Sequence, residues 1–379
     1  MHDNENAHPN GSPDASPSTQ QGGKALQARI TDAITQAGGW LGFDRFMALA
    51  LYAPGLGYYA NAGRKFGTMP EGGSDFVTAP ELSPLFGQTL AVQVADMLDR
   101  TGTDEVWEFG AGTGALAAQL LEHLGARVRR YTIVDLSADL RARQQLRLAA
   151  FTDRLHWADA LPAQIDGVLV GNEVLDAMPV QLLHRMGGQW HERGVVRQGA
   201  ALAWQDRPTA LRPPCEIAGT HDYLTEIHAQ GQAFVRTLAG HVRRGAALLL
   251  DYGFPEAEYY HPQRSTGTLM CHQGHRADAD PLADLGRKDI TAHVDFTGIA
   301  VAAQDAGWDV LGYTSQARFL INCGLPQRME QAPLAQRAMA HRLIAEHEMG
   351  ELFKVLALSR GVDPWDAPGF ALGDRSHTL

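Results

Sequence analysis

The hydrophobic pattern alternates between strand-like and helix-like segments from about residue 103 to the end of the chain. Short apolar runs typical of buried strands begin near seven positions, namely Val106, Tyr131, Leu155, Gly167, Ala247, Trp308 and Leu352. The segments between them carry apolar residues at helical spacing. Seven strands alternating with helices predict an α/β fold with a mostly parallel sheet, in which ligands bind at the carboxyl ends of the strands.

The first hundred residues show a different pattern. Residues 1–23 are rich in Asn, Ser, Pro and Gln and contain few large apolar side chains, which predicts a disordered leader. From Lys24 onward, Leu26, Ile30 and Ile34 lie four residues apart, as on one face of a helix. We therefore expect residues 24–100 to form a helical and loop extension in front of the sheet, within a single domain that spans 24–379.

Two long segments interrupt the alternation further along the chain. Residues 180–226 contain short alternating runs separated by glycines such as Gly187 and Gly188, which predicts an inserted β-meander. Residues 255–295 form a second long insertion with little periodicity. Long irregular segments in compact domains are often functional, so we expect both insertions to cover the cleft.

The stretch from Val106 to Leu121 predicts a strand, a glycine turn and a helix. Its sequence is VWEFGAGTGALAAQLL, and Gly110, Gly112 and Gly114 allow the backbone to turn sharply and to approach a ligand closely. The free N–H groups of the following helix favour negatively polarised groups at the same place. This pattern predicts a nucleotide-binding turn, although the string also fits a dinucleotide fingerprint.

Two acidic residues beside this turn narrow the choice of nucleotide. Glu108 precedes the first glycine by two residues, where a carboxylate would repel a pyrophosphate but attract an amino-acid ammonium. Asp135 follows the second strand, about twenty residues past the turn, where an acid commonly holds ribose hydroxyls. The pair favours S-adenosylmethionine (SAM). The structural alternatives are an edge salt bridge for Glu108 and a helix N-terminal position for Asp135, beside the N-cap candidate Ser137.

Composition and charge limit the classes of protein further. The chain has 379 residues, of which 45% are hydrophobic and 20% charged, as in ordinary globular proteins. Its formal net charge of -11 argues against a general nucleic-acid binder, and no apolar run is long enough to span a bilayer. Cys215, Cys271 and Cys323 are widely spaced, which indicates free thiols in a reducing compartment. The leader carries acids and no Lys or Arg before Lys24, so we expect a cytoplasmic location.

Several motifs together resemble the MidA-like SAM-dependent methyltransferases. The matching segments are SDFVTAPELSPLFG (residues 74–87), EFGAGTG (108–114), NEVLDAMPVQ (172–181), LLLDYG (248–253), GTL followed by His272 (from 267) and DITAHVDF (289–296). The resemblance implies a seven-stranded, Rossmann-like class I SAM-methyltransferase fold with a reversed last strand. It also implies methylation of a protein arginine, since a mitochondrial relative modifies a respiratory-complex subunit. Many relatives carry a proline where Ala111 stands, and the retained glycines should preserve binding.

Within this framework, we assign cofactor-binding roles to residues at the glycine turn, at the strand ends and in a covering loop. The assigned residues are Glu108, Gly110, Gly112, Gly114, Asp135, Leu136, Asp159, Ala160 and Asn172, with Asp75, Phe76, Thr78 and Glu81 in the loop above the ligand. Glu108 is expected at the methionine end, Asp135 and Leu136 at the ribose and adenine, and Asp159 with Ala160 at the adenine edge.

The acceptor end should contain paired carboxylates, because a protonated guanidinium needs them for orientation and charge. Glu173 and Asp176 are the first catalytic candidates, followed by His293, and Asp251, Tyr252 and Asp295 are expected to contact the substrate. The structural alternatives are N-capping or a loop salt bridge for the two acids and a hydrogen-bonded structural role for His293.

Other functions stay open at this point. A methyltransferase for a small molecule or another side chain, or a SAM-binding assembly chaperone without turnover, would share most of these features. A dehydrogenase fits poorly because of Glu108. Cys271, His272 and His275 offer too few ligands at the right spacing to predict a metal site.

Overall fold

The computed structural model describes residues 17–61, 78–135, 137–274 and 276–379. Most of the predicted leader, residues 1–16, lies outside this range. The first helix, α1 (Pro17–Gln36), begins at Pro17 and therefore seven residues before the expected boundary at Lys24. Proline is favoured in the first turn of a helix, and the glutamines that follow are good helix formers.

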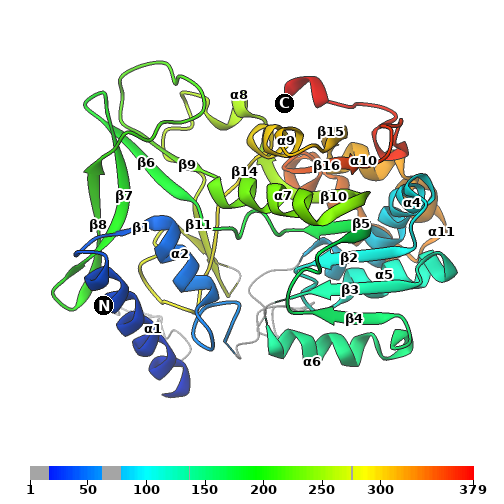
Figure 1. Ribbon diagram of the computed structural model, residues 1–379, viewed down its shortest axis with the longest axis horizontal. Coiled ribbons are helices and arrows are strands. Elements are labelled where there is room, and N and C mark those ends of the chain that lie inside the picture. Colours follow the sequence, from blue (N-terminus) through cyan, green and yellow to red (C-terminus); the bar gives the residue numbers. More distant parts are fainter. Residues whose placement is uncertain (1–16, 62–77, 136, 275) are drawn as a thin grey trace, which may run out of the picture.

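A mixed sheet forms the centre of the molecule (Figure 1). Its strands lie in the order β15 (Asp309–Ser315), β16 (Phe353–Arg360), β10 (Val242–Phe254), β5 (Ile165–Asn172), β2 (Glu105–Phe109), β3 (Arg130–Val134) and β4 (Leu155–Ala158). The strands from β10 to β4 pair in parallel, and β16 is antiparallel to both of its neighbours. All seven predicted strands are present, and the predicted fold with a reversed last strand is confirmed.

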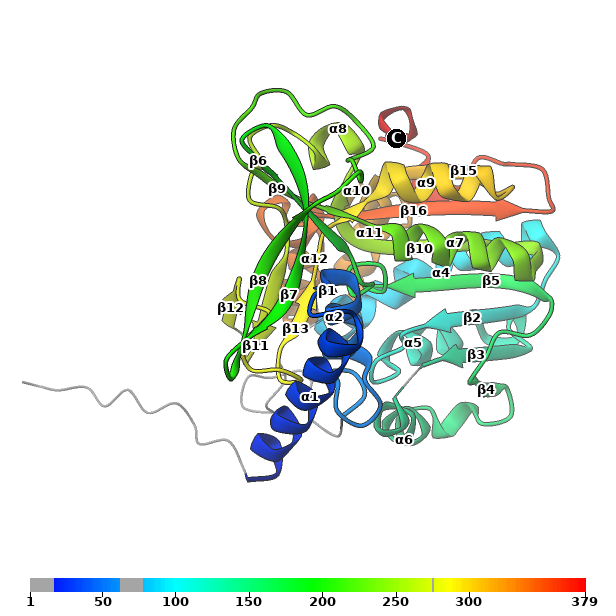
Figure 2. The same ribbon diagram turned by 60° about the vertical axis from the view of Figure 1, so that its left-hand side comes forward.

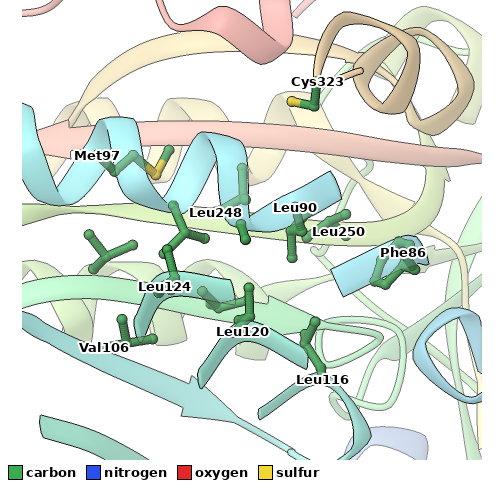
Figure 3. Close-up of a cluster of buried hydrophobic side chains, with 14 of the residues drawn as sticks. Phe86, Leu90, Met97, Val106, Leu116, Leu120, Leu124, Leu248, Leu250 and Cys323 are labelled. Atoms are coloured by element: carbon green, nitrogen blue, oxygen red, sulfur yellow. The ribbon is translucent and has the colours of Figure 1, made fainter. Parts of the chain in front are cut away.

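Helices cover both faces of this sheet. On one face, α4 (Pro84–Thr101) and α5 (Ala115–Leu124) pack against the sheet together with α10 (Gln316–Asn322), α11 (Leu325–Gln331) and α12 (Leu334–Ile344). Figure 3 shows Phe86, Leu90 and Met97 of α4 pointing toward Leu248 and Leu250 of β10. On the other face, α7 (Ala229–His241) and α9 (Phe296–Asp305) bury a second apolar cluster.

Three helices connect β15 to β16. Gly324 has a φ of 86°, which ends α10 in a left-handed turn. Pro333 then separates α11 from α12, because the residue before a proline is disfavoured in the helical conformation. A short π-helical turn, η4 (Glu346–Gly350), leads into β16.

The two predicted insertions form a separate lobe. The first insertion contributes β6 (Gln181–Met186), β7 (Gln189–Gln198), β8 (Ala201–Pro208) and β9 (Tyr223–Ile227), an antiparallel sheet that β1 (Leu41–Gly42) joins along β7. The second contributes α8 (Glu256–Tyr259), β11 (Met270–Gln273), β12 (Arg276–Asp278) and β13 (Asp289–Thr291), and its last strand, β14 (Val294–Asp295), pairs in parallel with the end of β10 as an eighth strand of the central sheet.

Figure 2 shows how this lobe is placed. The arrows of β2 and β5 point toward it, whereas the arrow of β16 points away. The helix α2 (Phe43–Tyr52) packs with α1 against the same lobe, in a third apolar cluster with Leu182 and Val195. The N-terminal extension and both insertions therefore gather at the carboxyl ends of the parallel strands, where ligands bind in sheets of this type.

Candidate active site

The glycine turn has the predicted backbone. It follows β2, and the φ angles of Gly110, Gly112 and Gly114 are 63°, 53° and 83°, values that side-chain-bearing residues rarely adopt. Gly114 lies directly before α5, and a Cβ atom there would approach Leu148 Cδ1 to 3.2 Å. The three glycines are therefore required by conformation, and the N-terminus of α5 points its free N–H groups at the turn.

A glutamine that the sequence analysis missed holds this turn in place. The Gln144 side chain is fully buried, and its Nε2 donates to the Gly112 carbonyl at 2.9 Å and to Asp135 Oδ2 at 2.9 Å. Its Oε1 accepts a hydrogen bond from Trp157 Nε1 at 2.8 Å. Gln144 thus ties the glycine turn to the ends of β3 and β4. The one signal in the sequence for Gln144 was a polar side chain on the inward-facing side of α6 (Ala138–Arg147).

Asp135 lies at the end of β3, as predicted. Its Oδ1 accepts from the Ser137 N–H at 3.0 Å, while Ser137 itself caps α6. The structural alternative for Asp135, a position at the N-terminus of a helix, is therefore present. The hydrogen bond from Gln144 to Asp135 is present as well. Leu136 lies outside the described residues.

Glu108 does not lie at an open mouth of the turn, as we had expected. Its side chain is 3% exposed, and Oε2 accepts a hydrogen bond from the Tyr131 hydroxyl at 2.7 Å. Burial raises the pKa of Glu108 to about 8, the Tyr131 hydrogen bond opposes this, and the nearby Asp135 adds to it. The expectation failed because residues alternate along β2, which places Glu108 on the sheet face that α4 and α5 cover. The salt-bridge alternative is also wrong, since the partner is a tyrosine.

The covering segment ends in the short helix α3 (Ala79–Leu82), which Thr78 precedes in an extended conformation. Glu81 pairs with Arg147 of α6 at 2.6 Å and accepts a hydrogen bond from the hydroxyl of Thr113 in the glycine turn. Glu81 therefore anchors the covering segment to the turn and to α6. Asp75 and Phe76 lie outside the described residues.

The residues after β4 stand apart from the other predicted cofactor contacts. The Asp159 side chain is 85% exposed and pairs with Arg141 of α6 at 3.2 Å. Ala160 is also exposed. No hydrogen bond in the described part of the chain joins this edge to the glycine turn other than through Trp157 and Gln144.

Carboxylates collect just beyond the end of β5 and in the last residues of β10. We use the term acidic cluster for Glu173, Asp176 and Asp251: the charge of Asp176 raises the pKa values of Glu173 and Asp251, and the charge of Glu173 adds to the shift of Asp251. Asp176 is 5% exposed and Asp251 is 1% exposed. Burial is the main cause of the upward shifts, and it brings the pKa of Glu173 to about 8 and that of Asp176 to about 6.

Glu173 has an unusual backbone. Its φ of 55° is one of two positive values among the described non-glycine residues, and such conformations typically cost about 1 to 3 kcal/mol. The strain places the carboxyl where Asn172 Nδ2 donates to Oε1 at 2.9 Å and the Ala79 N–H donates as well. Asn172 Oδ1 is buried without a hydrogen-bond donor in the residues that the structure describes. Strain and an unpaired buried oxygen at one place are typical of ligand-binding sites.

Asp251 has a structural role that the sequence analysis did not foresee. Its Oδ2 accepts from the N–H groups of Val174, Leu175 and Asp176 at 3.0, 2.8 and 3.3 Å, and its Oδ1 accepts from the Tyr252 N–H. With both oxygens occupied, Asp251 fixes the loop after β5 instead of contacting a substrate. Tyr252 meets the expectation more closely, because its hydroxyl donates to Asp176 Oδ2 at 2.5 Å.

His293 borders this arrangement. Its ring packs edge-on against Tyr252 with centroids 5.0 Å apart and stacks on Phe254 at 5.3 Å. Burial and the positive charges of Arg264 and Lys354 lower the pKa of His293 to about 4, so the imidazole is neutral at pH 7. Asp295 is instead the N-cap of α9: its side chain is 1% exposed and accepts from the Gly298 N–H, so the substrate role predicted for it is wrong.

Two tyrosines of the N-terminal extension complete the surroundings of the acidic cluster. The rings of Tyr52 and Tyr59 stack 5.6 Å apart, and the Tyr59 hydroxyl donates to both oxygens of Asp289 at 2.8 and 2.9 Å. The Tyr52 hydroxyl donates to the Ala177 carbonyl, next to Asp176. The tyrosines could not be placed from the sequence, because they come from a segment more than a hundred residues away.

The ion pairs of the described residues leave the acidic cluster uncompensated: none joins Glu173, Asp176 or Asp251 to a lysine, arginine or histidine. No group of three or more metal-ligating side chains with suitable geometry occurs there either. Also within the described ranges, no helix combines the length and apolar character needed to cross a bilayer.

The seven main strands of the central sheet, with the last one reversed, the glycine turn and the acid after β3 together define a class I nucleotide-dependent methyltransferase. The residues fit SAM, because the turn offers close backbone approach and Asp135 stands where ribose hydroxyls are held. The family described as "Putative S-adenosyl-L-methionine-dependent methyltransferase" matches residues 89–314, more than half of the chain, and the chain belongs to this family. The predicted family and SAM as its cofactor are thereby confirmed.

Relatives with names and structures agree with this family. A Burkholderia thailandensis protein, solved bound to S-adenosyl-homocysteine, is 50% identical with a TM-score of 0.92, over 97% of this chain and all of the other. The mitochondrial protein arginine methyltransferase NDUFAF7 homolog of Caenorhabditis elegans is 26% identical, over 87% of this chain and 84% of that protein. Human NDUFAF7, also a mitochondrial protein arginine methyltransferase, is 25% identical, over 83% and 78%.

The comparisons also correct one prediction. From the acidic leader we expected a cytoplasmic location, but the named relatives from worm, fly, fish and human are all mitochondrial proteins, so that prediction is wrong. The charge of the leader was an unsuitable basis, because it says nothing about the relatives' location.

Proposed function

We propose that this chain transfers a methyl group from SAM to the guanidinium group of an arginine in a protein substrate. The observation that carries the proposal is the acidic cluster, in which Asp176 and Asp251 are buried and Glu173 is half-buried, and which has no cationic partner among the described residues. Burying charge without a partner is unfavourable, so a cationic substrate group would supply the missing interaction. The names of the relatives, protein arginine methyltransferases, support the same acceptor.

The cofactor end would be formed by the glycine turn and its surroundings. We assign Gly110, Gly112 and Gly114 to close backbone contact and Asp135 to the ribose hydroxyls. When bound, SAM supplies a methyl group on a positively charged sulfur, which is already activated toward attack.

The acceptor end would be formed by Glu173 and Asp176. Carboxylates bind a planar guanidinium through paired hydrogen bonds, which fixes one nitrogen toward the cleft. The Asp176 carboxyl has a free position for this contact, because Oδ1 is buried without a hydrogen-bond donor in the described structure, while Tyr252 occupies Oδ2. Orientation of this kind accounts for up to roughly 7 to 11 kcal/mol of a reaction barrier in well-aligned systems.

Charge balance requires one proton to leave the acceptor. A guanidinium enters with one positive charge and leaves as methylguanidinium with the same charge, while the sulfur becomes neutral. We assign the proton to Asp176, because its pKa of about 6 keeps it ionised at pH 7 yet basic enough to accept a proton. Neutral His293, which packs on Tyr252, is the next group outward.

The test uses purified protein, SAM with a tritiated methyl group, and soluble protein extracted from cells that lack this chain. After acid hydrolysis of the labelled protein, methylarginines are separated and counted. We expect label in methylarginine, with the host's own respiratory-complex subunits as the first proteins to inspect by mass spectrometry. Label in another residue or in small molecules would refute the arginine acceptor, and SAM binding without any label would indicate an assembly factor without turnover.

A further inference from the structure

Glu226 is a buried carboxyl outside the site described so far. It lies in β9 of the first insertion, and its side chain is 0% exposed. Oε1 accepts from the N–H groups of Thr268 and Leu269 at 2.8 and 3.1 Å, and Oε2 accepts from the Tyr259 hydroxyl at 2.9 Å and the Thr268 hydroxyl at 3.1 Å. Four hydrogen-bond donors to one buried carboxyl offset the cost of removing it from water. A carboxyl at the surface would not need so many donors.

The second insertion is shaped around this carboxyl. Gly267 has a φ of 73°, and a Cβ atom added there would lie 2.5 Å from Glu226 Oε1. Glycine at this position therefore allows the segment from Gly267 to Leu269 to close over the carboxyl and to donate both of its N–H groups. The two insertions are joined at this point by hydrogen bonds rather than by apolar packing alone.

The same contact reaches His293. The Thr268 hydroxyl, which donates to Glu226, accepts from the His293 N–H at 3.0 Å. On the other side, the Tyr259 hydroxyl lies 3.2 Å from Nε2 of His228, and the His228 ring faces the main chain of His293. Glu226 thus holds both sides of the short segment that carries the His293 ring to Tyr252.

We propose that Glu226 is a positioning residue, which through Thr268 fixes the His293 ring beside Tyr252 and so sets the geometry of the acceptor end. The inference rests on the proposed function, because Tyr252 is the residue that donates to Asp176. Glu226 touches neither cofactor nor substrate in this scheme. Its loss should therefore impair methyl transfer while leaving SAM binding intact.

The position of His293 can be followed by its titration. The titratable and charged groups that face His293 are Tyr252, Arg264, Lys354 and His228. In its buried place, stacked on Phe254, the ring stays neutral down to low pH. A ring released from this place becomes hydrated, and its pKa returns toward the ordinary value of about 6.5.

The experiment compares the full-length protein with Glu226→Gln and Thr268→Val. Glu226→Gln keeps the shape but cannot accept from all four donors, and Thr268→Val removes only the hydroxyl that links Glu226 to His293. Glu192→Gln removes a carboxyl from β7, two strands away in the same sheet, and serves as the matched control. For each protein we measure thermal unfolding, SAM affinity, methyl transfer in the tritium assay, and the His293 imidazole resonance between pH 7.5 and 5, assigned with His293→Asn.

We expect both variants to fold, to bind SAM as the wild type does, and to lose methyl transfer by about tenfold or more. The His293 resonance should not titrate in the wild type or the control but should titrate within this range in both variants. If Glu226→Gln fails to fold, Thr268→Val decides. A His293 resonance that stays neutral at pH 5 in a folded variant overturns the proposal. Because this resonance requires no acceptor, a wild type without methyl transfer would count against the proposed function alone.

Discussion

The cofactor end and the acceptor end of the site differ in how they are built. The cofactor end comes from consecutive elements of the main sheet, from β2 to α6, and is held by contacts of main-chain groups and one glutamine, Gln144. The acceptor end combines the ends of β5 and β10 with the second insertion and the N-terminal extension, and buried carboxyls dominate it. A cofactor common to many enzymes needs a conserved shape of backbone, whereas a particular acceptor needs charges that distant segments supply.

The largest expected effect of a substitution on SAM binding is at the glycine turn of the cofactor end. Replacement of Gly112 by valine places a β-branched residue at a φ of 53°, so we expect SAM affinity to fall by about a hundredfold or more. Isothermal titration calorimetry measures the effect. Gly188→Val is the matched control, since Gly188 has a φ of 78° with no atom within 4 Å of an added Cβ, in a hairpin of the insertion lobe. Equal losses in the two variants would mean that general strain, not the turn, limits binding.

The second test separates the two ends by their function. In Glu173→Gln, the acceptor loses a carboxyl that a bound guanidinium would hold in its ionised form, while the glycine turn keeps its contacts. We expect methyl transfer to fall by about a hundredfold and SAM affinity to stay within about threefold of the wild type. The tritium assay and calorimetry on one preparation give both values. If SAM affinity alone decreased, Glu173 would belong to the cofactor end.

The same variant should change stability in a pH-dependent way. Burial raises the pKa of Glu173 from 4.5 to about 8 in the folded protein, so the folded state binds the proton more tightly than the unfolded state. The resulting stability is complete below pH 4.5 and is lost as the pH rises toward 8. Glu173→Gln has no such loss, so it should be more stable than the wild type by about 1 to 3 kcal/mol at pH 8 and much less so at pH 5.

Urea unfolding at pH 5 and pH 8 measures this difference. Glu216→Gln serves as the control, because Glu216 is exposed and lies outside the acidic cluster. A difference between wild type and Glu173→Gln that is equal at both pH values would show that the Glu173 carboxyl is ionised in the folded protein without cost.

The smallest expected effect concerns the hydrogen bonds that Gln144 makes at the cofactor end. Gln144→Ala removes the hydrogen bonds to the Gly112 carbonyl, Asp135 and Trp157, and we expect SAM affinity to fall by about tenfold. Gln145→Ala, an exposed neighbour on the same helix, controls for the loss of a glutamine. A loss of protein stability without any change in SAM affinity would reduce Gln144 to a packing residue.

The sequence predicted the backbone of the glycine turn well, because its signals are local. Three glycines with positive φ and an acid at a strand end follow one another within a few elements, and periodicity alone placed all seven strands. Glu108 was the exception: its carboxyl faces Tyr131, and only the side of the sheet that α4 and α5 cover decides this.

The acceptor end was predicted less completely, for reasons of distance. Glu173 and Asp176 could be singled out as candidates because they follow a strand directly, and their catalytic role stays a prediction. Asp251 and Asp295 are also aspartates near strand ends. Their carboxylate oxygens, however, accept hydrogen bonds from main-chain N–H groups, and these contacts cannot be read from the sequence. Tyr52, Tyr59 and Glu226 were missed, because segments far apart in the chain bring them into place.

Both insertions leave the sheet at adjacent strands, one after β5 and the other after β10, and each returns to the sheet or its covering helices without altering strand order. A change in either insertion therefore leaves the SAM-binding turn unaltered. Proteins descended from such a fold could acquire new substrates by exchanging these two insertions, while they inherit the cofactor end unchanged.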